Sequence, residues 1–435
     1  MSATNSGAAD AAASPQSEAP YEVETPAKRI VIGVAGGIAA YKSCALIRYF
    51  TERGHSVRVV PTASALEFIG KATFEALSGN PVDTGVFEKV PEVQHVKLGQ
   101  QADLVIVAPA TADVMARAAH GRADDLLTAT LLTARCPVLF APAMHTEMWD
   151  HPATVDNVAT LRARGVVVME PASGRLTGHD SGPGRLPDAD EIGGLGAMLL
   201  ERRDSLPRDL TGCTLVVTAG GTREPLDPVR FLGNRSSGKQ GFALARLAVQ
   251  RGASVTVVAG ATAELPVPAG VRVVNVTTAE QMRKAVHQLS ERADIVIMAA
   301  AVADFRPVSV AESKIKKGND EPTSIPLVKN PDILAEVVKR RDQGELPVTR
   351  VIVGFAAETG DEQGDVLTHA RSKLNRKRCD LLVVNAVGEG KAFEVDSNMG
   401  WLLKADGTES ALPLSSKNLM ASRILDAVSS VLHTS

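Results

Sequence analysis

The sequence predicts an α/β protein of two doubly wound, Rossmann-like domains with mostly parallel sheets. Three observations predict this fold. Apolar runs typical of buried strands alternate with helical patterns, their order in the first half recurs in the second, and Gly- and Ala-rich turns follow the strands. Alternating strands and helices favour parallel sheets that helices cover on both faces. Ligands of such domains bind beyond the carboxyl ends of the strands, where these turns lie.

In the first half, residues 29–34 form an apolar run that predicts the first strand, and the turn 35–42 follows. The pattern of residues 43–52 predicts a helix that ends before Gly54. Residues 57–60 predict a second strand, and the apolar run 102–108 predicts a third.

The second half repeats this order, with strands predicted at 214–218, 255–258 and from 293 onward. A polar loop, residues 234–241, opens its first helix, expected over 242–248. A helix N-terminus with free backbone N–H groups favours anions. Because Arg235 and Lys239 add positive charge, the loop predicts a phosphorylated ligand. Residues 201–208 are the expected linker between the halves.

Composition limits the function classes. A chain of 435 residues with 44% hydrophobic and 22% charged residues is typical of a globular protein of two or three domains. A net charge of -3 and 3% aromatic residues argue against a nucleic-acid partner. No apolar run reaches the roughly 18 residues of a membrane span, so no membrane partner is expected. Residues 1–26 are rich in Ala, Ser, Pro and Glu and predict a disordered tail.

Four cysteines (Cys44, Cys136, Cys213 and Cys379) are scattered without a CxxC pair. We interpret them as buried thiols of a protein in a reducing, cytoplasmic compartment.

Dinucleotide binding is disfavoured. Neither turn fits G-x-G-x-x-G, and the second strands end in Pro61-Thr62 and Ala259-Gly260, without an acid for ribose hydroxyls. A tandem NAD oxidoreductase is therefore kept only as a disfavoured alternative function. Small residues at 36 and 37, with the Thr62 and Ser64 hydroxyls, suit a mononucleotide such as FMN.

Four segments of the first half, predicted at strand ends or in loops, carry the chemistry: the turn 36–42, a loop with His95, the turn Pro109-Ala110-Thr111-Ala112, and residues 142–149. Together they resemble the flavin-dependent cysteine decarboxylases, and the second half resembles phosphopantothenate–cysteine ligases. From about Lys28 onward the chain is similar to the bifunctional decarboxylase/ligases of coenzyme A biosynthesis. The resemblance implies a tail at 1–26, a flavodoxin-like FMN-binding decarboxylase domain at 27–206 and a CTP-dependent ligase domain at 207–435.

The resemblance also implies two reactions. The ligase joins 4′-phosphopantothenate to L-cysteine through an acyl-cytidylate made from CTP, which releases pyrophosphate and then CMP. The decarboxylase converts 4′-phosphopantothenoylcysteine into 4′-phosphopantetheine. A simple α-amido carboxylate cannot lose CO₂ without an electron sink, and FMN supplies one by transiently oxidising the neighbouring CH₂–SH group.

For the decarboxylase, the resemblance implies that His95 takes a proton from the substrate thiol, for which imidazole suits neutral pH. His145 and Met148 would contact the substrate. The residues implied for FMN are Gly36, Gly37, Ile38, Thr62, Ser64, Pro109, Ala110, Thr111 and Ala112.

This half departs from its family at two points. His145 replaces the usual Asn, and the flap 173–185 has Thr177-Gly178 where many members carry a protonating cysteine. The proton must then come from water, His179, Asp180 or another donor, or this half is catalytically weak or inactive.

For the ligase, the resemblance implies that Asn234 stabilises the acyl-cytidylate and Lys314 polarises the activated phosphate. The remaining substrate contacts are Asp304, Pro331, Asp332, Ile333, Leu334, Phe355, Lys373 and Lys377. Residues 329–334 are expected to start a helix with Pro331 in its first turn. Asp304 also fits a helix N-cap. Accumulating phosphate charge calls for cations and Mg²⁺, whose ligands the sequence does not identify.

Two alternatives stay open: a ligase with a weak or regulatory flavin half, and a flavin-binding regulatory protein. The resemblance further implies a homo-oligomer with trimeric contacts among flavin domains and dimeric contacts among ligase domains, as in a dodecamer, and CTP rather than another nucleotide.

Overall fold

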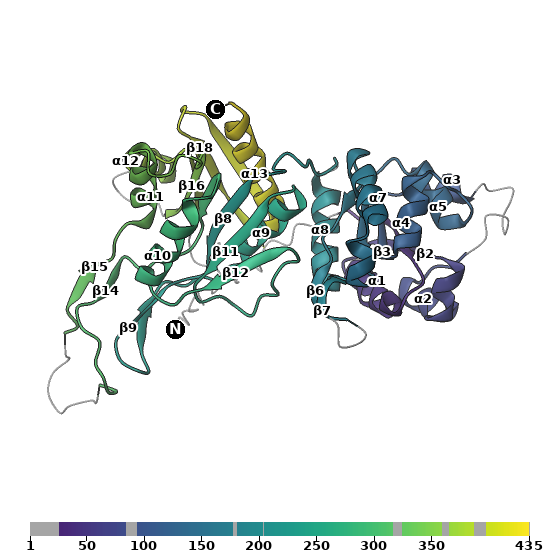
Figure 1. Cartoon of the computed structure of the whole chain (residues 1–435), viewed down its shortest axis with the longest axis horizontal. Helices are drawn as coiled ribbons and strands as arrows, with labels where there is room; N and C mark the ends of the chain where they lie inside the picture. The colour runs from purple at the N-terminus through teal and green to yellow at the C-terminus, as the bar shows by residue number, and fades with distance from the viewer. Residues whose placement is uncertain are drawn as a thin grey trace, which may run out of the picture.

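The computed structural model describes residues 26–83, 94–176, 181–202, 204–315, 324–358, 365–386 and 397–434. The chain forms two lobes joined side by side, with the first half on the right of Figure 1 and the second half on the left. Each lobe is a central sheet with helices on both faces. The predicted fold class of two doubly wound α/β domains is confirmed.

The first lobe has a five-stranded parallel sheet in the order β2-β1-β3-β4-β5. This is the order of flavodoxin-like domains. The strands are β1 (Arg29–Val34), β2 (Ser56–Pro61), β3 (Leu104–Ala110), β4 (Val138–Pro142) and β5 (Val167–Val168), and a hairpin of β6 (Ala172–Arg175) and β7 (Ser181–Arg185) follows. The helices are η1 (Ile38–Lys42), α1 (Ser43–Thr51), η2 (Ala63–Glu67), α2 (Lys71–Ser78), α3 (Gln94–Gln101), α4 (Ala112–Ala119), α5 (Leu126–Thr133), α6 (Thr146–Trp149), α7 (Pro152–Ala163) and α8 (Ala189–Arg202).

The second lobe has an eight-stranded sheet in the order β12-β11-β8-β13-β16-β17-β18-β19. Its first six strands are parallel and follow the Rossmann order, and the last two are antiparallel. The strands are β8 (Thr214–Ala219), β11 (Ser254–Ala259), β12 (Val271–Asn275), β13 (Ile295–Met298), β16 (Val351–Glu358), β17 (Leu381–Ala386), β18 (Ser397–Lys404) and β19 (Glu409–Ser416). The helices are α9 (Lys239–Gln250), α10 (Ala279–Ser290), α11 (Ile333–Asp342), α12 (Val366–Lys377) and α13 (Lys417–Thr434).

Two short antiparallel hairpins protrude from this lobe, at the lower left of Figure 1. They pair β9 (Arg223–Pro225) with β10 (Phe231–Gly233) and β14 (Phe305–Pro307) with β15 (Leu327–Lys329). We call them, with the adjoining residues up to 315 and from 324, the arm. The sequence pattern missed the first hairpin, so the loop 234–241 follows β10 and not the strand β8 directly.

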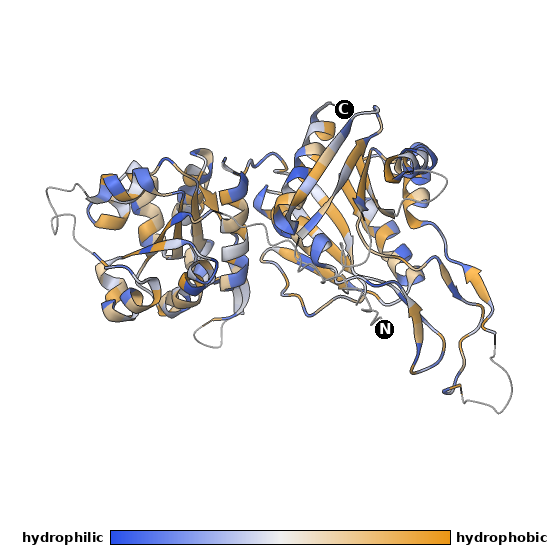
Figure 2. Ribbon diagram, turned by 180° about the vertical axis from the view of Figure 1, so that it is seen from behind, coloured by the Kyte–Doolittle hydropathy of each residue, from blue (hydrophilic) through white to orange (hydrophobic). Residues whose placement is uncertain are grey.

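The central strands are apolar on both faces because helices cover both faces of each sheet, as Figure 2 shows by their hydrophobic colour. Every residue of β3 is buried. Local sequence sets the helix starts. For example, Thr278 and Gln281 form a capping box at the N-terminus of α10, and Asp125 and Thr128 form one at α5.

Several local predictions need correction. His95 lies in the first turn of α3 and not in a loop. Pro331 precedes the N-cap Asp332 of α11, so it lies just outside the helix and not in its first turn. Asp304 lies beside β14 and caps no helix. The expected linker is shorter, since α8 continues to Arg202.

The cysteines are all free, as expected, but only two are buried. Cys213 and Cys379 are buried, whereas Cys44 and Cys136 are half-buried. Burial raises the pKa of the Cys136 and Cys379 thiols to about 11.

The two lobes share one continuous hydrophobic core. Leu195 and Met198 of α8 belong to the same cluster of buried side chains as Leu419 and Ile424 of α13. Polar contacts reinforce this junction: Arg202 donates to Ser422 Oγ and Asp426, and Ser416 donates to Glu201 at 3.0 Å.

In the described part of the chain, no helix is both long enough and apolar enough to span a bilayer.

Two candidate nucleotide sites at the sheet edges

In the first lobe, the turns after β1, β2 and β3 meet at one edge of the sheet. The amide of Thr62 donates to Val34 O at 2.9 Å, and the amide of Ala35 donates to Pro109 O at 3.2 Å. The Thr62 and Ser64 hydroxyls lie 3.1 Å apart. The structure therefore brings together the three turns from which the sequence predicted FMN contacts.

Gly36 has no room for a side chain, since an added Cβ would lie 2.4 Å from Ser64 Oγ and 2.7 Å from its backbone carbon. Gly37 faces a more open space, where the nearest atom to an added Cβ is Thr111 Cγ2 at 3.7 Å. The side chain of Ile38 is 66% exposed. Small residues, hydroxyls and an uncovered apolar side chain at one edge fit a phosphorylated cofactor with a flat ring, such as FMN.

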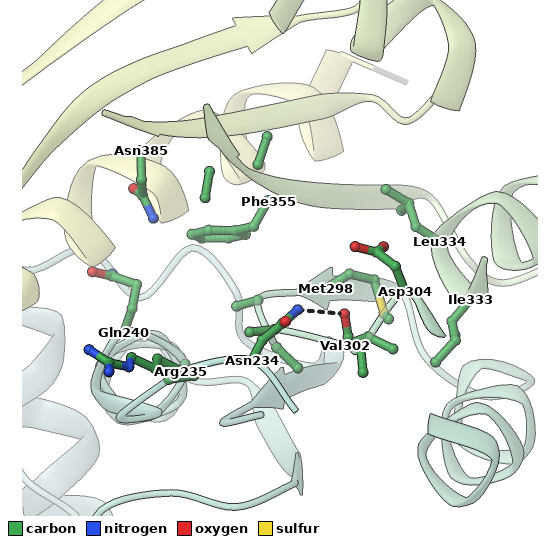
Figure 3. A pocket seen from close by; sticks show the side chains of 18 of the residues that line it. Asn234, Arg235, Gln240, Met298, Val302, Asp304, Ile333, Leu334, Phe355 and Asn385 are labelled. Atoms are coloured by element: carbon green, nitrogen blue, oxygen red, sulfur yellow. Dashed lines mark hydrogen bonds between the residues drawn. The ribbon is translucent and has the colours of Figure 1, made fainter. Parts of the chain in front are cut away.

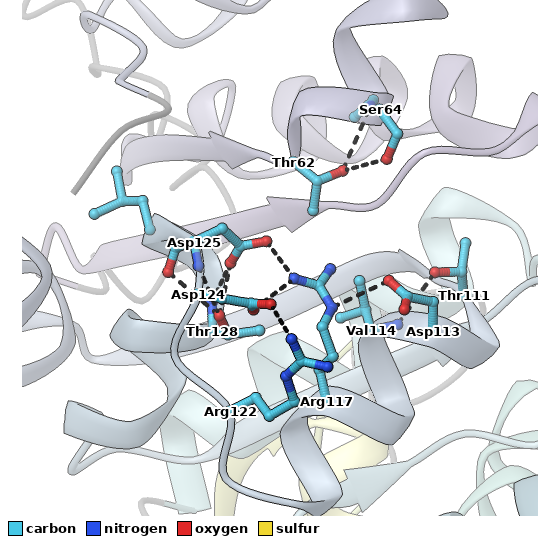
Figure 4. Close-up of polar contacts among 12 residues, drawn as sticks. Thr62, Ser64, Thr111, Asp113, Val114, Arg117, Arg122, Asp124, Asp125 and Thr128 are labelled. Carbon is cyan, nitrogen blue, oxygen red and sulfur yellow. Dashed lines mark hydrogen bonds and ion pairs between the residues drawn. The ribbon is translucent and has the colours of Figure 1, made fainter. Parts of the chain in front are cut away.

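The start of α4 is held rigidly below this edge (Figure 4). Thr111 caps the helix by accepting a hydrogen bond from the amide of Val114. Arg117 forms ion pairs with Asp113 at 3.0 Å and with Asp125 at 2.7 Å, which ties α4 to the start of α5. Burial alone would lower the pKa of Arg117, but its hydrogen bonds to Asp125 and Asp124 raise it.

The segment after β4 packs against the flap hairpin β6–β7. The amide of Met144 donates to Gly184 O at 2.9 Å, and Thr146 Oγ1 donates to Pro183 O at 2.7 Å. Met148 is exposed and His145 is half-buried, with 44% of its side chain exposed, and His145 Nδ1 lies 3.6 Å from Glu147. The segment is thus open to a substrate, while Thr177, Gly178, His179 and Asp180 of the flap lie outside the described residues.

His95 contacts α5, because Thr133 Oγ1 donates to its backbone carbonyl at 2.8 Å. Its ring Nδ1 is buried and has no hydrogen-bond partner within the described ranges. The described contacts of His95 do not join it to the turns at the edge of the sheet.

In the second lobe, a cavity of about 820 Å³ opens above the carboxyl ends of the central strands. The loop 234–241, the strand ends of β13, β16 and β17, and the start of α11 line it. Figure 3 shows Asn234 below and Phe355 above, with Asp304 to their right. Nine of the ten residues predicted for the ligase line this cavity: Asn234, Asp304, Pro331, Asp332, Ile333, Leu334, Phe355, Lys373 and Lys377.

Hydrogen bonds hold the loops of this cavity in place. Asn234 Nδ2 donates to Val302 O at 3.1 Å, which leaves its Oδ1 available. Asn330 Nδ2 donates to Ala303 O at 2.8 Å. Gly221 N donates to Ala261 O at 2.9 Å and packs directly under Asn234. The side-chain amide of Asn234 is therefore positioned by the backbone carbonyl of Val302.

The cavity is strongly basic. Six cationic side chains line it, against the two carboxylates of Asp304 and Asp332. The cations are Arg235, Lys239, Lys329, Lys373, Lys377 and Lys417. Lys377, the last residue of α12, forms an ion pair with Asp332, the N-cap of α11. This pair holds the end of α12 next to the start of α11. The excess of positive charge and the helix N-termini suit a triphosphate.

Lys314 does not line this cavity. It is exposed at the end of the described arm segment, next to Ile315. Ile315 is held by Asp227, whose carboxylate accepts from its amide at 3.2 Å, and by Arg230, which donates to its carbonyl at 2.6 Å. Burial opposes ionisation, but amide and guanidinium donors keep the pKa of Asp227 well below its usual range.

Three polar residues of the cavity lie outside every segment predicted for the site, namely Asn385, Asn398 and Lys417, whereas Gln240 belongs to the predicted loop 234–241. Asn398 Nδ2 donates to Asn385 Oδ1 at 3.0 Å, and Gln240 Nε2 donates to Lys417 O at 3.3 Å. Asn385 ends an apolar strand, which is a signal that could have been used. Asn398 comes from the antiparallel strand β18 and Lys417 from the start of α13, and neither has such a signal.

Within the described ranges, no group of three or more His, Cys, Asp or Glu side chains could hold a metal ion. Asp304 and Asp332 are the carboxylates that line the cavity of the second lobe, and Mg²⁺ usually takes one or two protein carboxylates together with substrate phosphates.

Comparisons with known proteins cover both lobes. Residues 18–197 match the family described as "Flavoprotein", and residues 210–432 match "DNA/pantothenate metabolism flavoprotein C-terminal domain". The "Coenzyme A biosynthesis bifunctional protein CoaBC" of Mycolicibacterium smegmatis is 70% identical over 405 residues, which are 93% of this chain and 98% of the relative. The protein of the same name from Mycobacterium tuberculosis (strain H37Rv) is 70% identical over 401 residues, 92% of this chain and 96% of the relative. A solved "C-terminal Domain of Coenzyme A biosynthesis bifunctional protein CoaBC" is 36% identical, with a TM-score of 0.43, and covers 52% of this chain and 100% of its own.

Proposed function

The chain belongs to the family of bifunctional coenzyme A biosynthesis proteins, and we propose how its two sites divide the two reactions of that family. It is an enzyme with a phosphopantothenate–cysteine ligase activity and a phosphopantothenoylcysteine decarboxylase activity, and its flavin half uses FMN. An identity of 70% over 93% of the chain favours two active halves over a ligase with an inactive flavin half.

We assign CTP-dependent ligation to the second lobe, residues 207–435. The observation that carries this assignment is the basic cavity, where six cations face two carboxylates. Carboxylate oxygen is a poor leaving group, so 4′-phosphopantothenate must first be activated. Phe355 offers a ring for the cytosine, and the N-terminus of α11 and the lysines of α12 receive the phosphates. Asn234 stabilises the acyl-cytidylate through its free amide oxygen and its positioned NH₂ group.

Lys314 keeps its proposed role as the group that polarises the activated phosphate. This role requires the arm segment that carries Lys314 to move toward the cavity when the nucleotide binds. Asp304 and Asp332 are our candidates for holding Mg²⁺ with the phosphates. EDTA would then abolish pyrophosphate release from CTP, and added Mg²⁺ would restore it.

We assign decarboxylation to the first lobe, residues 27–206. Bound FMN supplies the reversible oxidation that makes loss of CO₂ possible. Gly36, Gly37 and the hydroxyls of Thr62, Ser64 and Thr111 bind its phosphate, and Ile38 packs on its ring. His95 takes the proton of the substrate thiol, and His145 donates a hydrogen bond to the substrate carboxylate or amide. The final proton comes from water, His179 or Asp180, because no cysteine stands in this flap.

One experiment tests both assignments. Purified protein is incubated with 4′-phosphopantothenate and CTP, and pyrophosphate is measured before and after cysteine is added. Pyrophosphate without cysteine, followed by 4′-phosphopantetheine and CO₂ with it, is the expected result. Release of pyrophosphate only when cysteine is present would contradict the acyl-cytidylate route, and accumulation of 4′-phosphopantothenoylcysteine would contradict an active first lobe.

We propose that the arm is a contact with a second copy of this chain. Ten of the twenty large hydrophobic side chains exposed in the described part lie on it, among them Phe231, Val308 and Leu327. Hydrophobic segments extend along the arm at the lower right of Figure 2. An exposed apolar patch of this kind marks an interaction surface. Together with trimeric contacts of the flavin domains, such pairs would build a dodecamer.

Light scattering of purified Leu327→Glu protein tests this contact. We expect its mass to fall to that of a trimer, while Val267→Glu, at an exposed position away from the arm, keeps the mass of the original assembly. An unchanged mass of the Leu327→Glu protein would exclude the arm as the contact.

We infer that the enzyme works in the cytoplasm, because all four cysteines are free thiols. Cell fractionation followed by an assay for the ligase checks this location.

A further inference from the structure

A second, smaller cavity lies where the two lobes meet, outside both sites described above. Its volume is about 180 Å³. That is the space of about six water molecules at roughly 30 Å³ each. It is smaller than the roughly 300–1,000 Å³ of pockets for drug-sized ligands. The space therefore suits a small ion or metabolite and excludes a nucleotide.

Three parts of the chain build this cavity. Arg162 comes from α7 and Val168 from β5 of the first lobe, Arg208 comes from the connection between the lobes, and Gln250 ends α9 of the second lobe. A molecule in the cavity would contact both lobes and the connection at once.

The side chain of Gln250 is the unusual feature. Gln250 is 3% exposed and lines the cavity, yet neither its Nε2 nor its Oε1 has a hydrogen-bond partner in the described part of the chain. Burying an amide without partners is costly, so such groups usually face a ligand or an ordered water molecule. Its NH₂ group can donate and its oxygen can accept.

The charge at the cavity is positive. Arg162 donates to Val168 O at 2.8 Å and to Glu170 at 2.6 Å, while its Nε has no partner in the described ranges. Arg208 donates to the backbone carbonyl of Gln250 at 3.3 Å, and no carboxylate among the described residues lies within ion-pair distance of it. Glu170 neutralises one of the two guanidinium groups, so one positive charge remains. Burial and the nearby Arg162 lower the pKa of Arg208, which an anion would reverse.

We propose that this cavity binds a small oxyanion, a phosphate or a short carboxylate, between Arg208, Arg162 and the amide of Gln250. The guanidinium groups pair with its oxygens, and the Gln250 NH₂ group donates to it. A hydroxyl of a protonated phosphate or a hydroxy acid donates to Gln250 Oε1. Because the ligand touches both lobes, its binding stabilises their junction.

The test uses the full chain loaded with FMN and saturated with CMP, and the variants described below distinguish the junction cavity from phosphate positions that remain open in the catalytic sites. Inorganic phosphate and lactate are added in separate titrations at constant ionic strength, followed by calorimetry and by thermal unfolding. We expect saturable binding of at least one of the two anions, together with a rise in the melting temperature of the protein. The anion that binds more tightly identifies the ligand class as a phosphate or a carboxylate.

Variants locate the site. Gln250→Glu keeps the size of the side chain but repels an anion, and Arg208→Gln removes the unpaired cation. Each is expected to weaken binding at least tenfold. Arg292→Gln removes the same charge from an exposed position and is expected to leave the affinity within twofold of the original.

A further variant separates ligand binding from folding. Gln250→Leu removes both unpartnered polar atoms, so we expect a higher melting temperature without ligand and no response to either anion. The proposal is overturned if the unaltered protein shows no saturable binding, or if Arg208→Gln and Gln250→Glu bind as tightly as it does. In those cases the cavity holds water.

Discussion

At the scale of single residues, the side chains best placed for chemistry follow strands or open helices. Asn234 precedes α9, Asp304 follows β13, and Phe355 lies near the end of β16. The resemblance to the ligase family implied these three residues, and the fold explains why they meet, since carboxyl ends of parallel strands share one edge of the sheet. Asn398 reaches the same cavity from the antiparallel strand β18, and Lys417 reaches it from the start of α13, so no local signal marked them.

Asn234→Asp removes the NH₂ group that donates to Val302 O and adds a negative charge to the nucleotide cavity. We expect ligation to fall by about 10²–10³-fold, as for the loss of one donor at a developing charge. Decarboxylation of added 4′-phosphopantothenoylcysteine should be unchanged. Product formation is followed by chromatography, with Asn275→Asp at an exposed strand position as the control. Normal ligation by Asn234→Asp would contradict the assignment.

His95→Asn removes the imidazole whose Nδ1 has no partner in the described part. We expect decarboxylation to fall by about 10²–10⁴-fold, the usual contribution of a general base. Ligation should remain, so 4′-phosphopantothenoylcysteine accumulates. His120→Asn changes an exposed histidine and should retain both activities. Equal CO₂ release from the two variants would remove His95 from the mechanism.

At the scale of elements, the main strands and helices could be predicted because their patterns are local. The hairpins of the arm could not be predicted, since three-residue strands carry too little periodicity for a pattern to emerge. His95 was expected in a loop because α3 has only eight residues, of which few are apolar, so no helical pattern stands out.

Gly36→Ala tests the close approach of the turns after β1 and β2. The added methyl would lie 2.5 Å from Ser64 Cβ and 2.7 Å from its backbone carbon, so the two turns must separate. We expect the variant to lose most of its bound FMN, measured as flavin absorbance per chain. Gly70→Ala, where an added Cβ meets nothing within 4 Å, serves as the control and should keep its flavin. A full flavin content in both proteins would place the cofactor elsewhere.

At the scale of the whole molecule, the two lobes are joined by a core and by a buried charge network. Arg251 is fully buried and pairs with Asp209 and with Asp426, while it also donates to Ser422 O. Its partners come from the start of the second lobe and from α13, the helix that packs on α8.

Arg251→Ala leaves the carboxylates of Asp209 and Asp426 without their partner. We expect the free energy of unfolding to fall by about 2–3 kcal/mol. This is less than the roughly 3–5 kcal/mol of a fully buried pair, because the Asp426 side chain is 41% exposed. Urea denaturation measures the loss, with exposed Arg292→Ala as the control. A loss below about 1 kcal/mol would show that the network contributes little.

The pH dependence of stability follows from Asp209. Burial alone would raise the pKa of Asp209, but hydrogen bonds from Arg251 and Ser429 and the charge of Arg251 lower it in the folded state. A lowered pKa stabilises the fold above the unfolded value of about 3.9, and this gain is lost as the pH falls through the folded pKa. We therefore expect the stability difference between the unaltered protein and Asp209→Asn to be constant near neutrality and to shrink below about pH 4. Urea denaturation at several pH values checks this, and a difference that grows with acid would contradict it.

Local pattern alone determined that this protein has two α/β lobes with Gly-rich turns at their sheet edges, because strand and helix periodicity and Gly-rich turns depend only on neighbouring residues. The resemblance of the sequence to the ligase family named ten residues, nine of which line the cavity of the second lobe. Only the tertiary structure decided that Lys314 lies outside that cavity, that Asn398 and Lys417 lie inside it, and that Arg208 and Gln250 meet at a junction cavity. These contacts join residues far apart in the chain, and which of them form depends on how whole helices and sheets pack against each other.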